Sequence, residues 1–232
     1  MLRNAWNADM ADALRLAIAG EPMLLLADRA LYWPARQRLL IADLHLGKGT
    51  TFRSAGIAVP SGGTAHDLAR LDRLLVRTDA RSLWILGDFL HAARHPSTVA
   101  AWQAFRSAHP DLAMAVVPGN HDRALAGMTD IDILPDMILD GPFLFRHAPM
   151  KALSASHAPG EAHLICGHVH PVVALPALGT TPVFWLNQDQ TVLPAFSAFT
   201  GGWRLPPDQL RYSVACNGNA LVPLSQARHG AG

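Results

Sequence analysis

The sequence predicts an α/β domain, and three observations support this fold class. Apolar runs of strand length alternate with stretches that have helical periodicity. Half of the 232 residues are hydrophobic and 16% are charged, which is enough apolar material for one large core. Several apolar runs end at Asp, Asn or His, and ligands of α/β proteins bind at the carboxyl ends of strands. We therefore expect one domain over residues 1–232, with its core at about 22–223 and five strand ends meeting at one edge of the sheet.

The elements follow from the positions of the apolar residues. The strands expected in chain order are 23–28 and 31–33 as a hairpin, 38–42, 82–86, 112–117, 143–145 and 163–166. Helices are expected at 64–77 and 97–108, and in the first of them Thr64 and Asp67 have the spacing of a capping box. From 172 to 223 the chain is β-like, with Gly and Pro at its turns.

Charge and cysteine content limit the possible classes of protein. The formal net charge is +1, so the chain lacks the strong basic excess of many nucleic-acid-binding proteins, although a local basic groove stays possible. The two cysteines, Cys166 and Cys216, do not indicate an oxidising compartment, and Cys166 is expected to be a buried strand residue. The longest apolar runs are far too short to span a bilayer, and no leader is evident. We therefore expect a cytoplasmic protein.

The first two polar motifs contain carboxylates. Asp43 and His45 are two residues apart, and alternate residues of an extended segment point to the same side, so both could reach one cation. Taken alone, an Asp-x-His triplet is more often accidental. At the next strand end, Gly87 lets the backbone approach closely, and Asp88 could offer its two oxygens to two metals. Alone, Asp88 is more simply a turn or helix-capping residue.

Two later motifs add neutral ligands. In the Gly-Asn-His-Asp motif at 119–122, Asn120 offers a carbonyl oxygen to a metal, His121 can act as acid or base, and Asp122 could orient its imidazole. The other interpretation is a Gly-Asn turn with two polar neighbours. The Gly-His-x-His motif at 167–170 places two histidines on one side of an extended segment, which favours metal binding.

A single histidine between these motifs would complete such a site, and the sequence offers two candidates. His147 follows the apolar run 143–145 and so lies at a strand end, whereas His157 lies among small and polar residues. We favour His147 on this strand context and keep His157 as the alternative. His163 opens a strand, so we expect it at the opposite edge of the sheet.

The five motifs occur in the order Asp-x-His, Gly-Asp, Gly-Asn-His-Asp, a lone His and Gly-His-x-His. In this order they resemble the calcineurin-like metallophosphoesterase superfamily over nearly the whole chain. The resemblance implies two packed β-sheets flanked by helices, as a four-layer α/β/β/α sandwich. It also implies two metals that Asp88 bridges. One would be held by Asp43, His45, Asp88 and His170, and the other by Asp88, Asn120, His147 and His168.

The implied ligands indicate a mechanism. Nitrogen and oxygen donors without cysteine suit two divalent ions such as Mn²⁺, Fe or Zn²⁺, with Mn²⁺ as our first expectation. Two metals can hold the attacking and leaving oxygens of an in-line phosphoryl displacement and lower the pKa of bound water. We expect a hydroxide to attack phosphorus with no covalent enzyme intermediate. His121 would stabilise charge or protonate the leaving oxygen, with Asp122 orienting it.

Further segments are similar to one branch of the superfamily, the bacterial ligase-associated branch. These segments are 43–48, 50–53, 56–60 and 87–91. The similarity implies a Mn²⁺-dependent phosphodiesterase or nuclease that acts on DNA in repair, in association with an ATP-dependent DNA ligase and a helicase. Lys48, Arg53 and His91 are candidate substrate contacts. Lys48 and Arg53 could equally be solvated loop charges, and His91 could have a structural role.

Two other functions stay open on the sequence alone. The same metal core could act as a phosphatase or nucleotide pyrophosphohydrolase on a small substrate, because the surrounding loops choose the substrate. The protein could also be a non-catalytic scaffold, as are some relatives that have lost metal ligands. The complete set of ligand residues in this sequence argues against that function. No basic amphipathic helix is evident in the sequence, so we do not expect a membrane partner.

Overall fold

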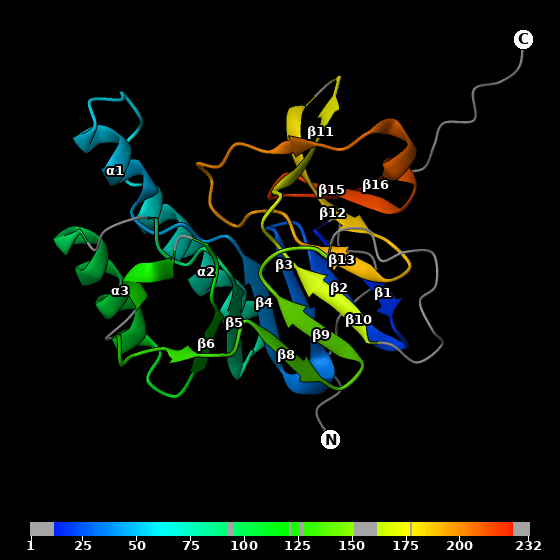
Figure 1. Cartoon of the computed structure of the whole chain (residues 1–232), viewed down its shortest axis with the longest axis horizontal. Coiled ribbons are helices and arrows are strands. Elements are labelled where there is room, and N and C mark those ends of the chain that lie inside the picture. Colours follow the sequence, from blue (N-terminus) through cyan, green and yellow to red (C-terminus); the bar gives the residue numbers. More distant parts are fainter. Residues whose placement is uncertain are drawn as a thin grey trace, which may run out of the picture.

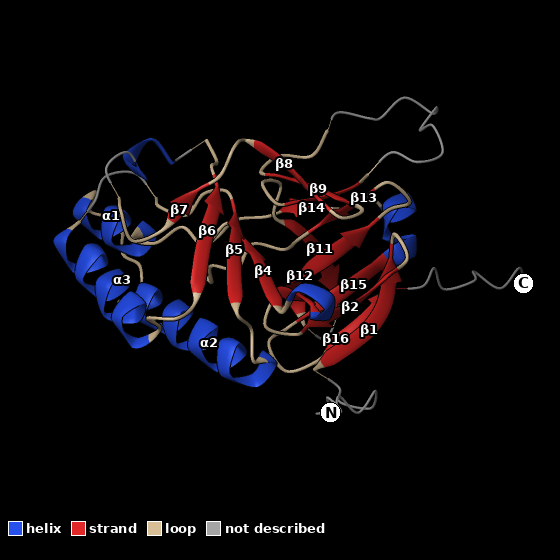
Figure 2. Cartoon of the chain, turned by 90° about the horizontal axis from the view of Figure 1, so that it is seen from below, coloured by secondary structure: helices blue, strands red, loops and turns tan. Residues whose placement is uncertain are grey.

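The fold consists of two β-sheets packed face to face, with helices on the outer face of the first sheet (Figures 1 and 2). The computed structural model describes residues 12–91, 95–120, 122–125, 128–150, 162–176 and 178–224. None of the helices within these ranges is long and apolar enough to cross a membrane.

The first sheet is seven-stranded, and its strands lie side by side in chain order. They are β1 (Ala13–Ile18), β2 (Glu21–Leu26), β3 (Ala30–Trp33), β4 (Arg38–Ala42), β5 (Ser82–Leu86), β6 (Ala113–Val117) and β7 (Asp132–Ile133). Pairing is antiparallel from β1 to β4 and parallel from β4 to β7. Parallel pairs need crossovers. The β4–β5 crossover contains α1 (Lys48–Ser54) and α2 (Gly63–Thr78), and the β5–β6 crossover contains α3 (Pro96–Ala108).

The second sheet is nine-stranded and mixed. Its main path runs β14-β11-β12-β13-β10-β9-β8, and β15 joins β12 to β16. The bounds are β8 (Met137–Asp140), β9 (Phe143–Arg146), β10 (His163–Cys166), β11 (Pro171–Leu175), β12 (Gly179–Leu186), β13 (Gln190–Val192), β14 (Trp203–Arg204), β15 (Ser213–Cys216) and β16 (Leu221–Leu224). Three short 3-10 segments complete the described elements: η1 (Pro34–Arg36), η2 (Asp122–Leu125) and η3 (Pro207–Tyr212).

Strand β4 shows how the two cores are divided. Its residues alternate, so that Leu39 and Ile41 face the helices while Leu40 and Ala42 face the second sheet. All four side chains are fully buried, as expected for a strand that is covered on both faces. The end of β4 is therefore enclosed by the helices on one side and by the second sheet on the other. The next residue, Asp43, lies at the junction of the two sheets.

Most expected elements are confirmed. Strands β4, β5 and β10 have the predicted bounds, and α3 begins one residue earlier than expected. The sequence analysis did not foresee β1, β7, β8 or α1. Two packed sheets flanked by helices are also observed. Within the described residues, however, the outer face of the second sheet is packed by the 3-10 segment η3 through Leu210, against Val173 and Val183, and not by an α-helix.

The capping box predicted at the start of α2 is wrong. The helix begins at Gly63, and its N-cap residue makes no side-chain hydrogen bond. The Thr64 hydroxyl instead accepts a hydrogen bond from the Gly47 N–H at 3.2 Å. The Asp67 carboxylate accepts one from the Ala198 N–H at 3.3 Å. Both side chains thus have distant partners, which spacing along the helix does not reveal.

Arg70 connects α2 to the chain segment that extends the edge of β4. Its buried guanidinium donates to the Phe196 carbonyl, lies 4.0 Å over the Phe196 ring and is 3.2 Å from Asp67 Oδ1. The Phe196 N–H donates in turn to the Ala42 carbonyl at 2.7 Å. Helix α2 therefore holds the segment that fixes the position of Asp43.

We expect Arg70→Met to lower the free energy of unfolding by about 3 kcal/mol, because it leaves the Asp67 carboxylate buried without its cation. Urea denaturation measures this change. Arg73→Met alters an exposed arginine of the same helix and is the matched control, with an expected change below about 0.5 kcal/mol. Equal losses in the two variants would contradict a structural role for Arg70.

Candidate metal centre

The expected ligands lie in loops at the carboxyl ends of strands from both sheets. Asp43 follows β4 and Asp88 follows β5 in the first sheet, whereas His147 follows β9 and His168 follows β10 in the second. The sequence analysis placed these strand ends on one sheet edge, and that expectation is wrong. The residues meet because two parallel regions, β4–β6 and β9–β10, point their carboxyl ends toward a common site.

Among the described residues, potential ligand atoms form two groups, and within each group the atoms lie within 4.8 Å of one another. The groups are Asp43 with His45 and His170, and Asp43 with Asp88 and His147. Within the first group, His170 Nε2 is 3.4 Å from His45 Nε2 and 3.5 Å from Asp43 Oδ1. Asp43 belongs to both groups and connects them.

Asp88 also lies between the groups. Its Oδ2 is 3.9 Å from His45 Nε2, and its Oδ1 is 3.7 Å from His147 Nε2. One carboxylate thus presents an oxygen to each group, which is the arrangement needed to bridge two cations. The resemblance implied Asp88 as the bridge, and the geometry gives Asp43 a central position beside it.

His168 adds a further nitrogen to the second group. Its Nδ1 lies 2.9 Å from His147 Nε2, and two imidazole lone pairs at this separation repel unless they share a proton or face a cation. Burial lowers the pKa of His168, and the neighbouring His147 lowers it further. The neutral imidazole, which is the form that binds metals, is therefore favoured.

The remote ring nitrogens of two histidines face backbone carbonyls. His170 Nδ1 is 3.1 Å from the Gly201 carbonyl, and His147 Nδ1 is 3.4 Å from the Leu86 carbonyl. A proton on each Nδ1 satisfies the carbonyl and leaves the Nε2 lone pair directed into the site. Burial lowers the pKa of His170, but the adjacent Asp43 carboxylate outweighs it and raises the pKa overall.

The residues present fit a pair of divalent cations. Asp43 is fully buried, and its Oδ2 accepts a hydrogen bond from the His168 N–H at 2.8 Å. Its Oδ1 is also buried and accepts no hydrogen bond from the described residues. A buried carboxylate oxygen without a donor is costly unless a cation compensates it. The oxygen and nitrogen donors suit Mn²⁺, Fe or Zn²⁺ better than a soft metal.

The sequence matches a family of known enzymes. The model for the family described as calcineurin-like phosphoesterases matches residues 38–191, well over half of the chain. The chain belongs to this family. It is a hydrolase of phosphoester bonds, and the family uses divalent metals.

One solved structure is similar to this phosphoesterase along most of the chain. The crystal structure of Pseudomonas putida nuclease MPE is 38% identical, with a TM-score of 0.77, over 91% of this chain and 100% of that chain. Yfce, a phosphoesterase from E. coli, is 15% identical with a TM-score of 0.44, over 81% of this chain and 92% of that chain. No curated protein matches the sequence.

The ligand loops of the phosphoesterase have unusual backbone conformations. Five of the expected ligands have positive φ: Asp43 (53°), His45 (46°), Asp88 (41°), His168 (76°) and His170 (49°). The expectation that paired residues share one side of an extended segment is therefore wrong, because each loop turns through the left-handed region. Such conformations cost of order 1–3 kcal/mol per residue and persist where the surrounding structure holds them. Here the His45 N–H donates to the Asp88 carbonyl at 2.8 Å, which links two of the loops.

Three glycines make room for expected ligands of the phosphoesterase. A Cβ atom on Gly87 would overlap the His147 ring, and one on Gly119 would overlap Asp88. A Cβ on Gly167 would press against Asp43 Oδ2. The glycines of the sequence motifs are thus explained by close approach to residues of other loops.

The Gly-Asn-His-Asp loop is described only in part. Asn120 is exposed and directly follows Gly119, which packs on Asp88. His121 and the alternative ligand His157 lie outside the described residues. Asp122 is buried, and its two carboxylate oxygens accept hydrogen bonds from the N–H groups of Leu90 at 3.0 Å and Gly119 at 2.8 Å.

Asp122 therefore ties the Asp88 loop to the Asn120 loop. Burial raises the pKa of Asp122, although hydrogen bonds from the backbone of Leu90 and Gly119 oppose the shift. Orientation of His121 by Asp122 stays a prediction.

The three expected substrate contacts differ in their surroundings. Burial lowers the pKa of Lys48, and the nearby Asp88 and Asp43 carboxylates oppose this shift, so the ammonium lies in the field of the site. Arg53 is exposed and its guanidinium donates to the Pro60 carbonyl at 2.9 Å. The His91 ring stands edge-on to that of His45, with centroids 5.5 Å apart.

Other histidines and Cys166 lie apart from the ligand groups. His163 opens β10, as expected, and its Nε2 is 2.9 Å from the Thr191 hydroxyl. Cys166 is fully buried within β10, which confirms its expected position, and burial raises the pKa of its thiol. Neither residue belongs to the two ligand groups.

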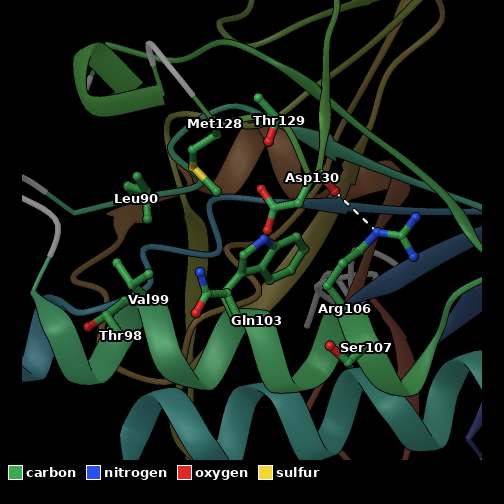
Figure 3. Close-up of a pocket in the computed structure, with 10 residues that line it drawn as sticks. Leu90, Thr98, Val99, Gln103, Arg106, Ser107, Met128, Thr129 and Asp130 are labelled. Atoms are coloured by element: carbon green, nitrogen blue, oxygen red, sulfur yellow. Dashed lines mark hydrogen bonds between the residues drawn. The ribbon is translucent and has the colours of Figure 1, made fainter.

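Two cavities of similar volume occur among the described residues. One, of about 500 Å³, runs along α3, where Arg106 donates to the Asp130 carbonyl at 3.1 Å (Figure 3). It contains none of the expected ligands. The other, of about 570 Å³, includes His168 in its lining together with Trp185 and Trp203. The sequence analysis described this region only as β-like and missed both tryptophans.

We expect Gly87→Ala to weaken Mn²⁺ binding at least about tenfold, because the new methyl group displaces the His147 ring. Isothermal titration calorimetry measures the affinity. Gly56→Ala is the matched control, since Gly56 has nearly the same φ (78° against 77°) but has no atom within 4 Å of the added Cβ. An equal loss of affinity in both variants would mean that backbone strain alone weakens Mn²⁺ binding, and would contradict displacement of the His147 ring as the cause.

Proposed function

We propose that this phosphoesterase is a Mn²⁺-dependent nuclease that hydrolyses phosphodiester bonds in DNA. The observation that carries the proposal is the convergence of the two ligand groups around Asp43 and Asp88. The 38% identity to a nuclease over 91% of the chain supports a nucleic acid as substrate.

The proposed ligands are the seven residues of the motifs. One cation would be held by Asp43, His45, Asp88 and His170, and the other by Asp88, Asn120, His147 and His168. When bound, two cations polarise a phosphoryl group and lower the pKa of water. The chain itself fixes the carboxylates and imidazoles before a substrate arrives, because their backbones are held by hydrogen bonds between the loops.

Other side chains would handle the substrate. The Lys48 ammonium, held near Asp88 and Asp43, is placed to attract a phosphate that flanks the cleaved bond. His121 would donate a proton to the leaving oxygen. Asp122 supports the loop that carries His121 through its bonds to Leu90 and Gly119. Arg53 and His91 would contact the same substrate.

The biological setting is part of the same proposal. A nuclease of this kind would act in DNA repair in the cytoplasm, in association with an ATP-dependent DNA ligase and a helicase. Co-purification of the ligase or helicase with the tagged protein tests this association, independently of the chemistry.

The purified protein should hydrolyse a bis-aryl phosphodiester with Mn²⁺, faster than the matching aryl monoester. Asp88→Asn should lower the rate at least about hundredfold, because removing a ligand exceeds the effect of outer-shell changes. Asp79→Asn removes an exposed carboxylate at the opposite end of β5 and should keep the full rate. Absorbance of the released aryl alcohol gives both rates.

The outcome separates the proposed function from its alternatives. Faster hydrolysis of the monoester would exclude a nuclease and indicate a phosphatase. Absence of hydrolysis with Mn²⁺ bound would indicate either a pocket that demands a specific substrate or a scaffold that binds a partner.

His121→Ala should lower turnover by about 10²–10⁴-fold while bound Mn²⁺ stays at the wild-type level, because a proton donor contributes to the rate and not to metal binding. Elemental analysis and steady-state kinetics on the same sample measure the two quantities. Loss of metal from this variant would reassign His121 as a ligand.

A further inference from the structure

A pocket with two tryptophan walls opens beside the metal centre. Its volume is about 570 Å³, and we call it the tryptophan pocket. The lining residues are Pro149, Met150, His168, Val169, Trp185, Gln190, Trp203 and Gln209. Since His168 also contacts His147 at 2.9 Å, the pocket and the metal centre share a side chain.

The backbone fixes one wall of the pocket to the metal ligands. The Trp203 N–H donates to the His170 carbonyl at 3.1 Å and to the Val169 carbonyl at 3.3 Å. The His170 imidazole in turn faces the Gly201 carbonyl at 3.1 Å. Trp203 is therefore held at a constant position relative to the ligand loop, so a molecule bound against it has a defined placement at the metals.

The side chains of the pocket suit a neutral, planar group. The rings of Trp185 and Trp203 have centroids 5.5 Å apart at 50°, and Trp203 is 42% exposed at the rim. Among the described lining residues there is no Lys, Arg, Asp or Glu. A phosphate would have no charged partner there, whereas an aromatic ring can stack on an indole.

Three polar atoms of the lining residues need hydrogen-bond partners. Trp185 Nε1, Gln190 Oε1 and Gln209 Oε1 are buried and make no hydrogen bond within the described part of the chain. An indole N–H only donates, whereas a carboxamide can donate and accept, since its oxygen and nitrogen exchange by rotation. A heterocycle with both ring acceptors and exocyclic donors would satisfy this set.

We propose that the tryptophan pocket binds the nucleobase of a nucleotide next to the phosphodiester that the metal centre cleaves. This inference rests on the proposed nuclease function and specifies its substrate. A base can enter such a pocket only when it is unstacked and unpaired, which is costly within a duplex. The preferred substrate is therefore single-stranded DNA or an unpaired end.

The first experiment measures nucleotide binding and does not depend on DNA cleavage. Titration calorimetry compares deoxycytidine 5′-monophosphate with deoxyribose 5-phosphate, using the Mn²⁺-loaded protein. The wild type should bind the nucleotide about tenfold more tightly, in line with base stacking on an aromatic side chain. Trp203→Ala should remove this difference, whereas Trp203→Phe should retain most of it.

Gln103→Ala is the matched control, because Gln103 lines the other cavity, along α3. This variant should bind both ligands as the wild type does. Equal Mn²⁺ content in all variants confirms that the metal centre is intact. Equal affinity of the wild type for the two ligands, or an unchanged preference in Trp203→Ala, would overturn the proposal.

The second experiment connects the pocket to cleavage. In a single-stranded oligonucleotide, replacing one nucleotide by an abasic residue should slow wild-type cleavage at the two flanking bonds about tenfold. In Trp203→Ala, intact DNA should be cleaved slowly and the abasic residue should have little further effect. An equal abasic effect in both proteins would overturn the role of Trp203.

The two proposals can fail separately. If the wild type prefers the nucleotide but cleaves no DNA, the nuclease function fails and the base site stands. If it cleaves DNA without any preference for the nucleotide, the base site fails and the nuclease function stands.

Discussion

The structure depends on one buried carboxylate at the junction of the two sheets. Asp43 ends β4, is fully buried and has one oxygen that accepts no hydrogen bond from the described residues. The groups around that oxygen, His147 and His170, come from the second half of the chain. An uncompensated charge in such a place would oppose folding. Packing of the two sheets and the capacity to bind cations are therefore coupled. Packing brings the histidines of the second sheet to Asp43, and a bound cation would compensate the carboxylate that packing buries.

The ligand loops combine strain with close packing. Left-handed backbone at the ligands re-aims each side chain directly after a strand, and glycines at 87, 119 and 167 leave space for side chains of neighbouring loops. These features reduce conformational freedom before any substrate binds. A site fixed in this way supports chemistry by positioning, in which the free energy needed to order the ligands has been spent during folding.

The tryptophan pocket would position the substrate in the same way, through backbone that is fixed before binding. The segment at 201–203 is bound to the ligand loop through Val169 and His170, so the pocket wall and the metal ligands form one unit. The metal centre and the tryptophan pocket would then recognise different parts of one nucleotide. In this proposal, the charged centre would hold the phosphate and the uncharged pocket would accept the base. Such a division would allow a chain with a net charge of only +1 to act on a polyanion.

The sequence by itself determined the strands β4, β5 and β10 and the polar residues that follow them, because buried strands and turn glycines leave local patterns. It also carried the order of motifs that defines the family. Only the tertiary structure decided that the ligands come from two sheets and turn through left-handed backbone. It likewise decided the partners of Thr64 and Asp67 and the pairing of Trp185 with Trp203. Such contacts join residues far apart in the chain, and their distances are set by sheet packing, which no local spacing records.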